Sequence, residues 1–99
     1  MSTQPERGEQ TDESYFRELL EDIVKSMVHE PDNVVVQSKS LGKSYTYVIQ
    51  TAPRDTGIVI GKKGAHIDAL RTIFAVISAA SDVRIMITVD APVRRTGDG

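Results

Sequence analysis

The chain has 99 residues, of which 39% are hydrophobic and 26% are charged, and its formal net charge is −2. Such a length provides one domain with a modest core, too small for a deep enzyme cleft. The absence of cysteine excludes disulfide frameworks and thiolate metal sites, and it fits a reducing compartment. No signal-peptide pattern begins the sequence, and its longest apolar stretch is far shorter than the about 18 residues of a membrane span. A cytoplasmic protein without membrane contact is therefore expected.

The charge is distributed unevenly along the chain. Residues 1–32 carry nine acidic and three basic side chains, a net charge of −6, whereas residues 33–99 carry nine basic and five acidic ones, a net charge of +4. A basic surface can therefore form on a protein that is acidic on average, and a polyanion responds to the local field. The uneven charge by itself is explained equally well by ordinary solvated surfaces of either sign.

The first half of the chain predicts a tail, a helix and a hairpin. Residues 1–11 are polar and predict a disordered tail. Over residues 15–28 apolar side chains recur in pairs at helical spacing, which predicts an amphipathic helix, and Pro31 marks its end. Residues 33–40 and 44–51 are rich in β-branched and aromatic residues, and the Leu-Gly-Lys between them predicts an antiparallel hairpin.

The second half predicts two helices and a strand. Asp55 or Thr56 is expected to cap a short helical turn that ends at Ile60, because a glycine follows. Residues 65–80 are apolar nearly all round, and a helix of this kind is expected to be largely buried. Apolar and polar residues alternate over residues 83–90, which predicts a half-buried strand.

Together these elements define a single domain over residues 12–91, in the order α–β–β–α–α–β. Residues 92–99 are expected to form a second disordered tail. The element order predicts a two-layer α+β fold, in which a three-stranded sheet packs on three helices.

The stretch Gly61-Lys62-Lys63-Gly64 raises the question of phosphate binding. A Walker A loop would need a glycine where Gln37 stands, and a Rossmann fingerprint would need one where Val59 stands. Both nucleotide motifs are therefore excluded, and a GxxG turn between two helices remains.

A lone GxxG is a weak signal, because glycine pairs are common at helix ends. This turn precedes a helix whose free N–H groups and dipole attract an anion. Glycines also let a sugar–phosphate backbone approach closely, and Lys62 and Lys63 add positive charge at that place. The stretch is suited to a polymer backbone, and ordinary solvated turn lysines are the alternative.

The letters VIGKKGAHIDAL resemble the V-I-G-x-x-G-x-x-I-x-x-L signature of the KH domain, which is matched at Val59, Ile60, Gly61, Gly64, Ile67 and Leu70. The predicted element order resembles the type II arrangement of that family. Residues 12–91 as a whole resemble the small single-KH bacterial proteins of the KhpA (YlqC) family.

The resemblance implies that about four nucleotides of single-stranded RNA are clamped, with the backbone on the GxxG loop and the bases in an apolar groove. It implies a site with Gly57, Ile58, Ile60 and Ile67 at the floor or wall, Gly61, Lys62, Lys63 and Gly64 as the clamp, and Arg84 or Met86 from the last strand. His66, which directly follows the loop, is a candidate phosphate donor. It also implies an RNA chaperone or post-transcriptional regulator, acting as a homodimer or with a larger KhpB (Jag)-like KH protein. No cofactor and no metal are expected.

Two positions depart from the family pattern. Ile58 and Ala65 stand where KhpA-like proteins usually have basic residues, and Asp68 lowers the positive potential further. RNA binding is then weak or depends on a partner, and Ile58 is free to serve a protein contact. An alternative function is therefore a KH-fold interaction or dimerisation module with weak or lost RNA binding, which the acidic first helix also favours.

An enzyme is not expected. His29 and His66 are accompanied by no nucleophile–base arrangement and no metal-ligand cluster.

Several of the residues named above have a structural explanation as an alternative to a role in binding. Ile60, Ile67 and Leu70 are candidates for the core, Arg71 for an ion pair with Asp68, His66 for an exposed position, and Tyr45 and Tyr47 for packing rather than base stacking.

Overall fold

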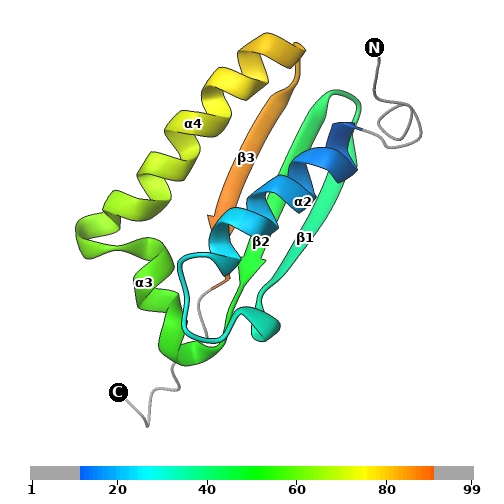
Figure 1. Cartoon of the computed structure of the whole chain (residues 1–99). Coiled ribbons are helices and arrows are strands. Elements are labelled where there is room, and N and C mark those ends of the chain that lie inside the picture. Colours follow the sequence, from blue (N-terminus) through cyan, green and yellow to red (C-terminus); the bar gives the residue numbers. More distant parts are fainter. Residues whose placement is uncertain (1–11, 91–99) are drawn as a thin grey trace, which may run out of the picture.

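The computed structural model describes residues 12–90. The elements in chain order are α2 (Asp12–Lys25), β1 (Val35–Leu41), β2 (Ser44–Gln50), α3 (Thr56–Ile60), α4 (Ala65–Ser81) and β3 (Arg84–Val89), as Figure 1 shows. Short 3-10 turns cover Pro31–Asn33, Pro53–Asp55 and Lys62–Gly64. The predicted α+β order is thereby confirmed. Both predicted tails, 1–11 and 92–99, and residue 91 lie outside the described residues.

The three strands form one sheet in the order β1-β2-β3. β1 and β2 are antiparallel, as the hairpin predicted, whereas β2 and β3 are parallel. A parallel pair needs a crossover connection, and α3 and α4 provide it. Figure 1 shows α2 and α4 on the same side of the sheet, so the domain has two layers and the other face of the sheet is open.

The core lies between the sheet and the helices. α2 contributes Phe16, Leu20 and Val24, and the sheet contributes Val36, Tyr47, Ile49 and Ile87. Val59, Ile67, Leu70 and Phe74 complete it from α3 and α4. Tyr47 is fully buried, and its hydroxyl donates a hydrogen bond to the carbonyl of Glu13 at 2.9 Å. The prediction that the strand tyrosine at this position packs in the core is thereby confirmed.

The first helix is shorter than its apolar pattern predicts. α2 ends at Lys25, well before Pro31, and the chain leaves it through a turn in which the Met27 nitrogen donates to the carbonyl of Val24 at 2.9 Å. The residues of this connector, from Ser26 to Asn33, then pass beside the start of α3. This placement matters for the functional site.

The expectation that the helix over residues 65–80 is largely buried is wrong. Only Ile67, Leu70 and Phe74 of α4 are buried, while Ile73 is 52% and Val76 is 68% exposed. The physical reason is the two-layer architecture, because no third layer covers the outer side of α4. Its apolar outer face is therefore open to solvent or to another molecule.

Candidate nucleic-acid interface

The GKKG turn reverses the chain between α3 and α4 through an unusual run of backbone conformations. Gly61, Lys63 and Gly64 have positive φ values of 79°, 56° and 79°. The Gly61 nitrogen closes α3 by donating to the carbonyl of Gly57 at 2.8 Å, and the Gly64 nitrogen donates to the carbonyl of Gly61 at 3.1 Å. The turn is thus internally hydrogen-bonded and has a defined shape.

The two glycines are needed for different reasons. A Cβ on Gly61 would lie 2.6 Å from Cγ and 2.7 Å from the backbone nitrogen of His66, so no side chain fits there. At Gly64 the nearest atoms would be 3.9 Å away, and there it is the positive φ that favours glycine. Lys63 adopts the left-handed conformation without being glycine, at a cost of about 1–2 kcal/mol.

Positive charge is concentrated on this turn. Lys62 and Lys63 are both exposed, and within the described part of the chain neither forms an ion pair with an acidic side chain. The turn immediately precedes α4, a helix of 17 residues, whose first N–H groups and dipole favour an anion. Two free cations therefore lie beside a positive helix terminus.

The nearest acidic group is partly neutralised. Asp68, in the first turn of α4, accepts a hydrogen bond from Nη1 of Arg71 at 3.2 Å, which confirms the predicted pair. Nε of Arg71 also donates to the backbone carbonyl of Ile87 at 3.0 Å. Arg71 thus links the first half of α4 to the second half of β3, along the open edge of the sheet.

Apolar surface adjoins the turn on the α3 side. Gly57 is exposed, and a Cβ placed on it would meet no atom within 4 Å. Ile58 and Ile60 are half-buried, whereas Val59 between them is fully buried. These residues directly precede the GKKG turn and give α3 a partly exposed apolar surface.

Two of the predicted site residues lie elsewhere. Ile67 is only 6% exposed and faces the core, as its structural alternative predicts. Arg84 begins β3, which follows the far end of α4 from the turn (Figure 1), and at about 1.5 Å per residue α4 separates the two ends by roughly 25 Å. Arg84 is also exposed while its neighbour Ile85 packs against the core, so it points to the open face of the sheet.

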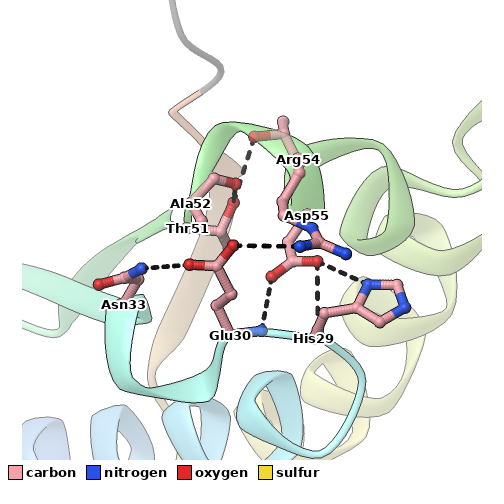
Figure 2. A network of polar contacts seen from close by, with 8 residues as sticks. His29, Glu30, Asn33, Thr51, Ala52, Arg54 and Asp55 are labelled. Carbon is pink, nitrogen blue, oxygen red and sulfur yellow. Dashed lines mark hydrogen bonds and ion pairs between the residues drawn. The ribbon is translucent and has the colours of Figure 1, made fainter.

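A buried carboxylate positions the start of α3 (Figure 2). Asp55 is 0% exposed; its Oδ1 accepts from the backbone nitrogen of His29 at 3.1 Å and lies 3.1 Å from Nδ1 of the same residue. Its Oδ2 accepts from the backbone nitrogen of Glu30 at 2.9 Å. The side chain therefore holds the connector after α2. Asp55, one of the two predicted caps, occupies the N-cap position of α3, but its side chain makes no capping hydrogen bond.

The hydrogen bonds determine the charge state of Asp55. Burial by itself raises the pKa of this carboxyl, but hydrogen bonds from the backbone of Glu30 and His29 and from the His29 ring outweigh burial, so the pKa lies below its ordinary value. An outer shell surrounds the carboxylate: Glu30 contacts Arg54 at 3.6 Å and accepts from Nδ2 of Asn33 at 2.8 Å. Sequence reasoning missed this network, because no local pattern links residues 26 positions apart.

Residues 12–90 contain neither a metal-binding cluster nor a membrane-spanning helix. No group of three or more His, Asp or Glu side chains there is arranged to hold a metal ion. No helix in the same range has the length and apolar character needed to cross a membrane.

A helix–GxxG–helix unit, packed with a third helix on one face of a three-stranded sheet, defines a KH domain with the type II element order. The family model described as KhpA/KhpB, KH domain, matches residues 17–89. The chain belongs to the KhpA/KhpB family of KH domains, which is non-enzymatic.

Three similar proteins match this chain over most of their own length. The RNA-binding protein KhpA of Listeria monocytogenes is 33% identical over 74 residues, which are 75% of this chain and 97% of that protein. The RNA-binding protein KhpA of Clostridium acetobutylicum is 34% identical over 74 residues, 75% of this chain and 99% of its own length. The protein of the same name in Streptomyces coelicolor is 39% identical over 62 residues, 63% of this chain and 78% of that protein.

Proposed function

We propose that this protein binds single-stranded RNA, with the sugar–phosphate backbone held on Gly61–Gly64 and bases against Gly57, Ile58 and Ile60. In this role it acts as an RNA chaperone or post-transcriptional regulator. The observation that carries the proposal is a pair of exposed lysines, without an ion-pair partner among residues 12–90, on a glycine-bounded turn at the start of α4. The names of the relatives, all RNA-binding proteins, support it.

The geometry explains why a polymer backbone suits the turn better than a nucleotide. The GKKG turn is exposed and short, so it offers an edge to a passing chain of phosphates. Phosphate contacts from Lys62 and Lys63 position the strand, while the apolar surface of α3 receives the bases. Arg84 and Ile67 are left out of this proposal, the first because of its distance along α4 and the second because of its burial.

The test is a charge reversal, Lys62→Asp with Lys63→Asp, measured by fluorescence anisotropy with a short labelled single-stranded RNA at several salt concentrations. We expect a large loss of affinity and a smaller salt dependence, since each lost phosphate contact on a single strand lowers the slope of log K against log salt by about 0.7.

The matched control is Lys39→Asp with Lys43→Asp, which changes the net charge equally. These lysines belong to β1 and the hairpin turn, and the Lys43 carbonyl accepts from the nitrogen of Arg84, far from the GKKG turn. The control variant should retain most of the affinity at moderate salt. Equal binding by the two double variants would contradict a clamp on the GKKG turn.

The exposed face of α4 favours an additional role in pairing with another KH chain. Ala69, Ile73, Val76 and Ala80 are all exposed and follow a spacing of four, three and four residues, which places them on one stripe. No charged residue occurs in α4 after Arg71. We propose that a second copy, or a larger KhpB-like protein, packs on this stripe.

Sedimentation of the wild-type protein and of Ile73→Glu tests the pairing. A wild-type dimer that becomes a folded monomer in the variant supports a homodimer through α4, while Thr72→Glu, on the neighbouring exposed position, controls for charge alone. A monomeric wild type rules out the second copy and leaves the KhpB-like partner, which is then tested by titration with that protein.

A further inference from the structure

His66 connects the two helices across the GKKG turn. Its Nδ1 lies 2.7 Å from the backbone carbonyl of Ile58, so the second residue of α4 is bonded to the last turn of α3. The ring fits there because Gly61 has no Cβ; a methyl group at Gly61 would lie 2.6 Å from Cγ of His66. The contact therefore closes the base of the turn that carries Lys62 and Lys63.

The chemistry of this hydrogen bond determines which ring nitrogen carries the proton. A carbonyl oxygen only accepts, so Nδ1 of His66 must be the donor, whether the ring is neutral or cationic. In the neutral ring the other nitrogen, Nε2, is consequently unprotonated. His66 is exposed, and the described residues provide no protein partner for Nε2.

We infer that His66 is a positioning residue of the RNA clamp, and that RNA binding is coupled to uptake of a proton at its Nε2. This inference rests on the proposed binding of RNA to the GKKG turn. The hydrogen bond from Nδ1 of His66 to the Ile58 carbonyl holds the shape of the turn in both charge states of the ring. Only the charged ring offers an Nε2–H donor to an RNA phosphate.

The charged groups around His66 determine the sign of the coupling. α3, which runs from Thr56 to Ile60, carries no ionisable side chain, and the turn contributes the cations Lys62 and Lys63. On α4, Asp68 is bound by Arg71. A bound phosphate neutralises the two lysines and accepts a hydrogen bond from Nε2–H, which favours the charged ring in the complex. Because linkage is reciprocal, RNA then binds more tightly as the pH falls.

The first measurement needs no RNA. Long-range ¹H–¹⁵N NMR spectra of the free protein above the titration range of imidazole should show the neutral ring protonated at Nδ1. A ring protonated at Nε2 would overturn the positioning role, whatever the outcome with RNA.

The second measurement is the affinity for a short single-stranded RNA between pH 5.5 and pH 8, where imidazole changes charge and carboxylates stay ionised. We expect the wild-type affinity to rise about five- to tenfold on acidification. His66→Asn keeps an N–H donor for the Ile58 carbonyl but has no Nε2, so it should bind with a flat pH profile. His66→Ala removes the hydrogen bond to the Ile58 carbonyl and should also weaken RNA binding at high pH.

His29 is the other histidine in the chain, and His29→Gln is the control for its titration; this variant should keep the wild-type pH profile. A flat wild-type profile, or a profile unchanged in His66→Asn, would overturn the coupling and leave RNA binding itself intact. Absence of RNA binding at every pH would overturn the coupling together with the proposed function.

Discussion

The carboxylate of Asp55 and the ring and backbone of His29 are joined by contacts of 3.1 Å, although the two residues lie on different segments of the fold. Asp55 ends the 3-10 turn before α3, and His29 belongs to the connector between α2 and β1. The start of the helix that leads into the GKKG turn is thereby held by the connector between α2 and β1.

Asp55→Ala should destabilise the domain, because it leaves the N–H groups of His29 and Glu30 without their acceptors beside a buried position. We expect thermal unfolding, followed by circular dichroism, to occur on the order of 10 °C below the wild type. Asp55→Asn retains an acceptor oxygen, so its melting temperature should fall less. If the melting temperature of the alanine variant were unchanged, the hydrogen bonds of Asp55 would not stabilise the domain.

Acidification should remove the contribution of Asp55 to the free energy of unfolding. Its hydrogen bonds hold the pKa of Asp55 below that of an ordinary aspartate, so the stabilisation is fully present above the ordinary pKa and is lost as the pH falls through the lower pKa of the folded state. Urea unfolding of the wild type and Asp55→Asn between pH 7 and pH 3 measures this. The difference in unfolding free energy should stay constant down to about pH 4 and then decrease; a difference that grows on acidification contradicts the assignment.

Lys63→Gly should stabilise the protein while weakening RNA binding. Glycine relieves the left-handed backbone at φ 56°, a gain of about 0.5–1 kcal/mol after the entropic cost of glycine. The same change removes one cation from the clamp. Lys62→Gly is the matched variant, because it removes an equal charge at a position without positive φ, and it should bring no gain in stability. Equal melting temperatures for the two variants would argue against strain at Lys63.

Alanine at Gly57 and at Gly61 should have opposite effects on stability. A Cβ at Gly57 meets no atom within 4 Å, so Gly57→Ala should stabilise α3 by about 0.5–1 kcal/mol. Gly61→Ala places its Cβ 2.7 Å from the His66 nitrogen at a φ of 79° and should destabilise by more than about 1 kcal/mol.

RNA titration of the stable Gly57→Ala variant then tests whether bases approach α3. We expect weaker binding, because the methyl group occupies the open surface beside Ile58 and Ile60. An affinity equal to that of the wild type would place the bases elsewhere.

Much of the fold could be predicted because its signals are local. The apolar pairs of α2, the β-branched strands around Gly42 and the glycines at 61 and 64 each act within a few residues of the chain. The same is true of the Arg71–Asp68 pair, whose members are three residues apart on one helix. For this reason the element order and the position of the GKKG turn between two helices were predicted correctly.

The sequence by itself determined the elements, their order and the glycine-bounded basic turn, since backbone propensity and periodicity act over short distances. Only the tertiary structure decided that Asp55 binds the connector at His29, that Arg84 lies at the far end of α4 and that Ile73 and Val76 remain exposed. Those outcomes depend on which elements become neighbours and on how many layers cover a helix. An apolar residue has the same character in the sequence whether the fold covers it or leaves it open to a partner.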